Sequence, residues 1–170
     1  MEEVGRWVTG GLVLVNQVLS ATVVLTSFSL FLYLLTHNFR SRVARAFCAL
    51  LIFVLFVYAG DVVLYAVQTP EAAERWLKFQ WIGIAFVPAA YLHLSDALLR
   101  TTNLRARWRT ISLLASYAAS TFFLAMVLLS DLLVHDGVFE PRASHLSAGP
   151  LFWLFALYFI VTVAWGAVNI

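Results

Sequence analysis

The sequence is poor in charged residues, and this shortage excludes a soluble protein. Only 12% of its 170 residues are charged and 62% are hydrophobic, whereas about 25% of a soluble domain is charged. The mean hydropathy is +0.88. A chain of this length cannot hide so much apolar surface in one soluble core, so the excess must face lipid. The net charge of +2 is too small to indicate nucleic acid as a partner.

Cysteine and lysine are almost absent, which narrows the chemistry further. The one cysteine, Cys48, excludes an internal disulfide and a cysteine-rich metal site. The one lysine, Lys78, lies outside the apolar core of its segment, so no lysine is placed for a retinal Schiff base. The sequence also lacks a glycine-rich phosphate loop, paired zinc-ligand spacing and a Gly-x-Ser-x-Gly nucleophile motif. We therefore expect no enzymatic activity, no metal and no cofactor.

Long apolar runs are what the sequence does have. Five segments approach or exceed the ~20 residues that a helix needs to cross a bilayer. Helices are expected over about residues 11–35, 44–67, 70–99, 111–134 and 151–170. The predicted fold class is an all-α integral membrane protein, a five-transmembrane-helix bundle that forms a single membrane domain over residues 1–170.

Basic residues are distributed unevenly between the two sides of this bundle. Seven lie in the loops after the first and third helices, and four lie on the opposite side. Because arginine and lysine accumulate on the cytoplasmic side, we expect the N-terminus outside and the C-terminus in the cytoplasm. The seven are Arg40, Arg42, Arg45, Arg100, Arg105, Arg107 and Arg109; the four are Arg6, Arg75, Lys78 and Arg142.

The third helix carries the clearest local signals. Thr69 can cap it, Pro70 suits its first turn, and Glu71 favours the positive end of the helix dipole. Pro88 lies in mid-membrane and cannot donate a hydrogen bond to the carbonyl of Ile84. A bend between these two residues is therefore predicted.

Two carboxyl groups lie at membrane depth, where an ionisable residue is a functional candidate; Asp131, near the end of the fourth predicted helix, is expected at the membrane interface instead. The first is Asp61, in the outer half of the second helix between Tyr58 and Tyr65. No cation within the spans is available to it, so we expect a neutral acid that is hydrogen-bonded to one of these tyrosines or to a serine. It serves either as a polar contact in the bundle core or as a sensor of an outside signal.

The second carboxyl group is Asp96, near the cytoplasmic end of the third helix. His93 precedes it by three residues, so the two share a helix face and can form a hydrogen bond. Alternatively, the carboxylate reaches water or Arg100. A signalling or proton-relay role is the functional reading of this pair.

The fourth helix carries a stripe of small residues. Ser112, Ser116 and Ser120 recur at steps of four, and small residues spaced this way let two helices approach closely. The stripe predicts a packing face within the bundle, or alternatively a dimer face.

Two stretches resemble a known family. The first is Trp76-Leu77-Lys78-Phe79-Gln80-Trp81-Ile82-Gly83, followed by Pro88. The second begins at Ser130-Asp131 and His135 and closes on Gly149-Pro150-Leu151-Phe152-Trp153-Leu154-Phe155 and Tyr158. Both are similar to the N-terminal seven-helix membrane region of bacterial histidine kinases. The resemblance extends over essentially the whole chain, although it covers only the first five helices of that region.

The resemblance implies a non-enzymatic sensory module in a two-component system. It would pass an external or intramembrane signal to a cytoplasmic kinase or cyclase domain, if the chain continues into one. It also implies a location in the bacterial inner membrane, as a multi-pass protein. The expected partners are the lipid bilayer, a second copy of the chain or other membrane subunits. The alternative function is a small structural or accessory subunit of a larger membrane complex.

Overall fold

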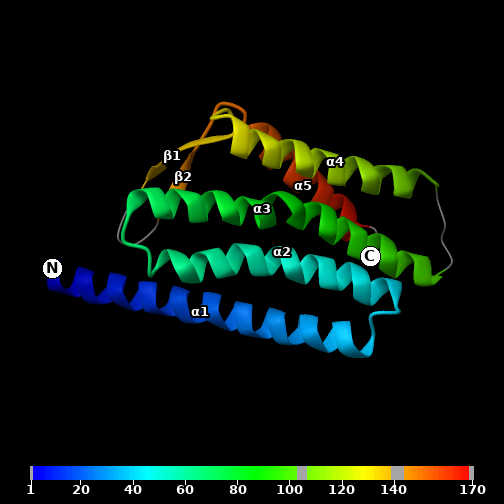
Figure 1. Cartoon of the computed structure of the whole chain (residues 1–170), viewed down its shortest axis with the longest axis horizontal. Helices are drawn as coiled ribbons and strands as arrows, with labels where there is room; N and C mark the ends of the chain where they lie inside the picture. Colours follow the sequence, from blue (N-terminus) through cyan, green and yellow to red (C-terminus); the bar gives the residue numbers. More distant parts are fainter. Residues whose placement is uncertain (1, 103–106, 139–143, 169–170) are drawn as a thin grey trace.

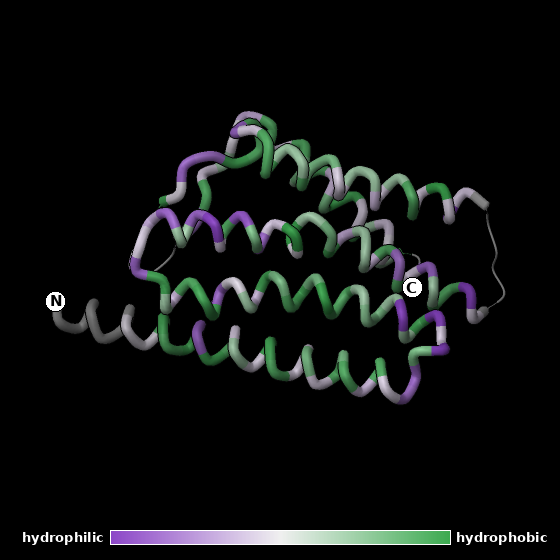
Figure 2. The backbone as a smooth tube through the Cα atoms, in the orientation of Figure 1, coloured by the Kyte–Doolittle hydropathy of each residue, from purple (hydrophilic) through white to green (hydrophobic). Residues whose placement is uncertain are grey.

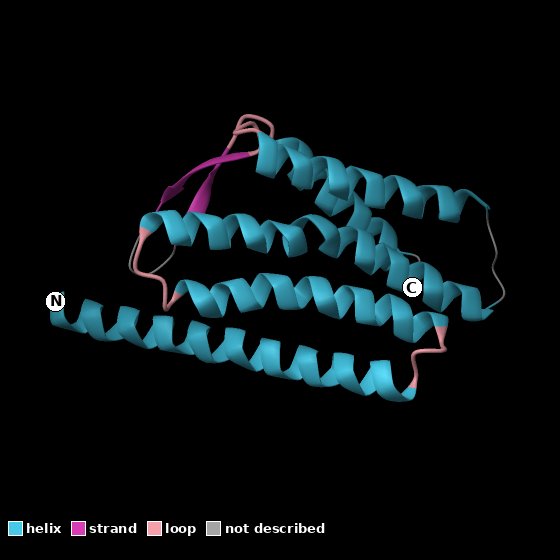
Figure 3. Cartoon of the chain, viewed as in Figure 1, coloured by secondary structure: helices cyan, strands magenta, loops and turns pink. Residues whose placement is uncertain are grey.

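The structure is a computed structural model that describes residues 2–102, 107–138 and 144–168 (Figure 1). Five helices dominate it, and two short strands form a hairpin between the last two (Figure 3). In chain order the elements are α1 Glu2–His37, α2 Arg42–Leu64, α3 Pro70–Leu99, the 3-10 helix η1 Arg100–Thr102, α4 Arg107–Leu129, β1 Val134–Val138, β2 His145–Ala148 and α5 Phe152–Val168.

Helix α3 is the centre of the bundle. Helices α1 to α4 lie side by side in sequence order, and α5 lies behind α3 and α4 in the view of Figure 1. Helix α3 contacts α2, α4, α5 and both strands, whereas the main neighbour of α1 is α2. Accordingly, half of the most apolar window of α3 is buried inside the protein, compared with 11% of that of α1. The exposed apolar side chains of α1 are therefore available to lipid.

Four helices are long and apolar enough to cross a membrane. These spans are Gly10–His37, Arg42–Leu64, Pro70–Leu99 and Trp108–Leu129; α5 is on average more apolar than these helices but has only 17 residues. Hydrophilic residues gather toward the two ends of the bundle, and hydrophobic ones fill its middle (Figure 2). The expected all-α architecture with five helices is thus present, and the chain is a multi-pass membrane protein.

The two ends of the bundle differ in character. The loop after α1, the last turn of α3 and the first turn of α4 lie at one end, which we call the arginine end because it carries Arg40, Arg42, Arg45, Arg100 and Arg109. The strands and the start of α3 lie at the other end, called the hairpin end (Figure 1). The loops that the sequence places on one side of the membrane therefore share one end of the structure.

The helix bounds match the predicted ones best for α3, which runs from Pro70 to Leu99 as expected, although Thr69 makes no side-chain capping hydrogen bond. Helix α1 is longer than the predicted 11–35, and α2 begins and ends two to three residues before the predicted 44–67. Helix α5 starts at Phe152, and the predicted last residues 169–170 lie outside the described part. Pro88 is fully buried within a continuous α3; the bend there stays a prediction.

The predicted end of the fourth helix is wrong. It ends at Leu129 instead of residue 134, and the apolar residues that follow fold back over the bundle. Leu133 and Val134 are buried in a cluster with Trp81, Phe123 and Phe155. The hairpin is antiparallel, with Val134 opposite Ala148 and Val138 opposite His145. Residues 130–134 were predicted to be helical because they are mostly apolar, but they cover the core at the hairpin end.

Candidate functional site

A buried polar contact joins α2 to α3 in the half of the bundle nearer the hairpin end. The Nε2 group of Gln80 donates a hydrogen bond to Oδ1 of Asp61 at 2.6 Å and another to the carbonyl of Val57 at 2.9 Å. Gln80 is buried and Asp61 is half-buried. A buried amide needs such partners because an unpaired polar group in an apolar interior is costly. The pair therefore fixes α2 and α3 relative to each other at this level.

A glycine makes room for this contact. Gly60 precedes Asp61 on α2, and a β-carbon at Gly60 would collide with Cγ of Gln80 and lie 2.9 Å from its Cδ. The side chain of Gln80 therefore crosses the bare backbone of α2 to reach both acceptors. In the sequence, the only trace of this contact is the pair Gly60-Asp61 in the second apolar segment and Gln80 in the third.

The predicted partners of Asp61 are not the ones found. The hydroxyl of Tyr65 instead accepts a hydrogen bond from Nδ2 of Asn16, which connects α2 to α1. Tyr58 is half-buried on α2. The partner of Asp61 is an amide of α3, which the sequence analysis did not single out. A Gln in an apolar segment, three residues before Gly83, was the signal that could have found it.

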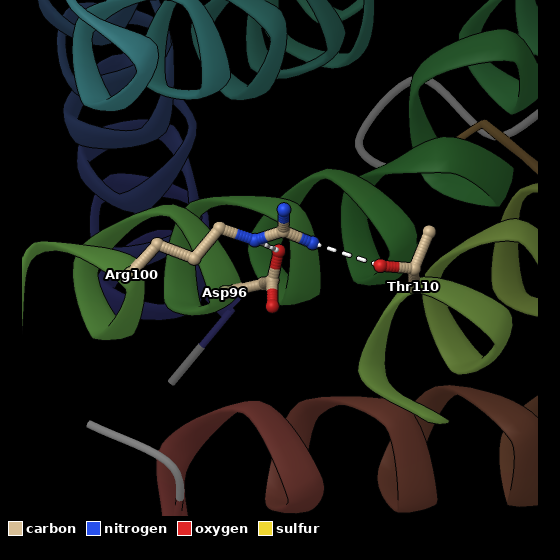
Figure 4. Close-up of polar contacts among 3 residues, drawn as sticks. All are labelled: Asp96, Arg100 and Thr110. Atoms are coloured by element: carbon tan, nitrogen blue, oxygen red, sulfur yellow. Dashed lines mark hydrogen bonds and ion pairs between the residues drawn. The ribbon is translucent and has the colours of Figure 1, made fainter. Parts of the chain in front are cut away.

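The expected hydrogen bond between His93 and Asp96 is also replaced by two others. Nδ1 of His93 lies 3.1 Å from the hydroxyl of Tyr117 on α4. Asp96 instead pairs with Arg100, whose Nε donates to Oδ2 at 2.6 Å. The Nη2 group of Arg100 donates to the hydroxyl of Thr110 at 3.0 Å (Figure 4). Both groups therefore link α3 to α4 at the arginine end, and the alternative partner Arg100 is the correct one.

The serine stripe of α4 is used inside the bundle. The hydroxyls of Ser120 and Tyr158 lie 2.8 Å apart, and the Tyr158 hydroxyl donates to the carbonyl of Ser116 at 2.9 Å. Both serines are buried, whereas Ser112 is half-buried and bonds to the carbonyl of Trp108 in its own helix. Tyr158 of α5 thus occupies the face formed by Ser116 and Ser120, so those two positions are not free for a dimer.

Helix α3 also holds α5 directly near the arginine end. The hydroxyl of Ser95 donates to the carbonyl of Gly166 at 2.8 Å. A β-carbon at Gly166 would lie 2.8 Å from Cε1 of Tyr91. The two helices therefore approach closely at this point. Helix α3 makes polar contacts with α2 in one half of the bundle and with α4 and α5 in the other.

The polar contacts of this site connect neighbouring helices. Within the described ranges, no group of three or more His, Cys, Asp and Glu side chains is positioned to hold a metal ion. Most of the polar contacts join two helices; the exceptions are the Ser112 hydrogen bond to Trp108 and the Asp96–Arg100 pair, each of which spans four residues of the chain.

Comparison with known families identifies the region. The family model described as the N-terminal 7TM region of histidine kinase matches residues 18–170, from within α1 to the last residue. No curated protein and no solved structure matches the chain significantly. The match includes α2 to α5 and both stretches that carry the resemblance in the sequence. The chain therefore belongs to the family of N-terminal seven-helix membrane regions of histidine kinases.

Proposed function

We propose that this chain receives a signal in the membrane and passes it, without catalysing a reaction itself, to a cytoplasmic kinase domain. The observation that carries the proposal is membership of the histidine-kinase family over residues 18–170. The family match favours a kinase over a cyclase as the output. The proposed location is the inner membrane of a bacterium, and a second copy of the chain is a proposed partner.

The proposed orientation has the hairpin end outside and the arginine end in the cytoplasm. Support comes from the five arginines at the arginine end, because basic loops stay on the cytoplasmic side. Glu71, Glu74 and Asp136 lie at the hairpin end, although acidic residues orient a chain only weakly. A kinase domain on the cytoplasmic side would then lie where its substrate ATP is found.

Helix α3 is the proposed carrier of the signal. At its outer half Gln80 bonds to Asp61 of α2, and near its inner end Ser95 bonds to Gly166 of α5. A ligand can change the populations of two helix arrangements only if it binds one of them more tightly. A signal that alters the Asp61–Gln80 contact would favour a different position of α3. Because α5 is held by α3, any segment that follows α5 would move with it.

Two substitutions test this role in the full-length protein. Asp61→Asn keeps an oxygen that can accept from Gln80 but removes the negative charge, so we expect an intact fold that no longer responds to added cations. Gln80→Leu removes the donor. Since Gln80 donates two hydrogen bonds and each contributes about 1 kcal/mol, we expect Gln80→Leu to change basal autophosphorylation by about 5- to 30-fold. Autophosphorylation in isolated membranes measures both.

Asp131→Asn is the matched control. It makes the same chemical change at an exposed position after α4, and its autophosphorylation should equal that of the unmodified protein. If Asp61→Asn and Gln80→Leu also behave like the unmodified protein, the α2–α3 contact has no part in signalling. A gene product that contains no kinase domain would instead support the alternative function, an accessory subunit of a membrane complex.

A further inference from the structure

A cavity at the arginine end has the composition of an anion-binding site. Its volume is about 380 Å³, within the range of small-molecule sites, and it lies over α3 between α2 and α4. A second cavity of about 180 Å³ adjoins it and shares Arg42, Ala97 and Arg100. The first is lined by Arg42, Arg45, His93, Asp96, Ala97, Arg100 and Leu113.

The charge in this cavity is unbalanced. Its one carboxylate, Asp96, is engaged by Arg100 at 2.6 Å. Arg42 and Arg45 are exposed and, within the described ranges, neither forms an ion pair. They also lie in the first turns of α2, which has no acidic residue in its first turn and no side-chain bond from its N-cap residue Ser41. The backbone N–H groups there add partial positive charge.

The surroundings of the cavity indicate a ligand that is partly apolar. Toward the middle of the bundle, the rings of His93, Tyr117, Phe86 and Phe53 follow one another, with successive centroids 6.0, 6.2 and 5.0 Å apart. Leu113, which lines the cavity, lies on α4 close to two exposed apolar side chains. These are Ile111, which is 61% exposed, and Leu114, which is 65% exposed. An anionic group among the arginines would therefore have apolar surface beside it on the membrane side.

We propose that this cavity binds the phosphate of an anionic phospholipid, with the headgroup between Arg42 and Arg45 and the acyl chains along α4 and the aromatic row. Both a lipid and free phosphate could supply the phosphate group. The lipid is favoured because the cavity lies where four apolar spans end, and basic pockets between membrane helices at that depth suit acidic headgroups. The inference goes beyond the proposed signalling role and does not depend on it.

The test uses full-length protein in a neutral detergent, titrated with a short-chain phosphatidylglycerol and followed by native mass spectrometry. Removing two arginines from the site should weaken binding about 30-fold, as each basic residue near an anionic surface contributes about fivefold. The variant is Arg42→Gln with Arg45→Gln. Arg42→Lys with Arg45→Lys keeps both charges and should bind within a few-fold of the unmodified protein.

The control removes two charges at the opposite end. Arg75→Gln with Lys78→Gln acts at the hairpin end and should leave phosphatidylglycerol binding unchanged. Short-chain phosphatidylcholine should bind weakly to all variants. Equal weakening by the two glutamine pairs, or none by Arg42→Gln with Arg45→Gln, would overturn the site. Displacement of the lipid by inorganic phosphate would overturn the assignment to a lipid.

Discussion

Replacing Gly83 with leucine should force α2 and α3 apart and lower the free energy of unfolding by about 3 kcal/mol or more, the upper range for overpacking. A β-carbon at Gly83 would already collide with the backbone carbonyl of Phe53 and lie 2.6 Å from Cγ2 of Val57. A backbone atom cannot move aside as a flexible side chain can. Unfolding in mixed micelles, followed by tryptophan fluorescence, measures the change.

Gly11→Leu is the matched control for this experiment. Gly11 is also in a helix that can span the membrane, but a β-carbon there would meet no other atom within 4 Å. Its substitution should change stability by no more than about 0.5 kcal/mol, as is usual for exposed positions. Similar losses for both glycines would show that the α2–α3 interface is less tightly packed than the structure indicates.

Removal of the guanidinium in Arg100→Met should cost about 3 kcal/mol, because breaking a buried ion pair leaves one charge uncompensated. The side chain of Asp96 is 8% exposed and that of Arg100 is 28% exposed. The other carboxyl oxygen, Oδ1, is buried and has no hydrogen-bond partner within the described ranges, so Arg100 is the main compensation for this charge. The same unfolding titration measures the loss.

The chain offers a matched pair for comparison. Glu74 and Lys78 form an ion pair with the same i,i+4 spacing on the same helix, but their side chains are 42% and 33% exposed. Lys78→Met should cost no more than about 0.5 kcal/mol, since solvent-exposed pairs contribute little. The double variant Asp96→Leu with Arg100→Met should recover most of the loss. If Arg100→Met and Lys78→Met cost the same, burial does not distinguish the two pairs.

Much of the fold could be predicted from the sequence because the membrane constrains it strongly. A long apolar run in lipid must be helical to satisfy its own backbone, so the five helices follow from hydropathy. The bounds of α3 were predicted best because Thr69, Pro70 and Glu71 mark its start and Arg100 follows its last apolar turn. Successive membrane helices run in opposite directions, so the loop that follows α1 and the segment that follows α3 must lie at the same end of the bundle.

The parts that could not be predicted depend on which helix faces meet. Hydropathy distinguishes a lipid-exposed segment from a polar one, but it does not distinguish lipid from protein interior. It therefore could not show that Leu133 and Val134 turn back to cover the core. For the same reason Asp61 was identified as a candidate, whereas its partner Gln80, which lies on another helix, was not.

Membrane topology tests the central claim most directly, because an input region can serve a cytoplasmic kinase only if the arginine end faces the cytoplasm. The measurement uses two fusions in bacterial cells, one after Arg105 and one after Asp136, each made with green fluorescent protein and with alkaline phosphatase. The account predicts fluorescence after Arg105 and phosphatase activity after Asp136. Phosphatase activity after Arg105 together with fluorescence after Asp136 would contradict it.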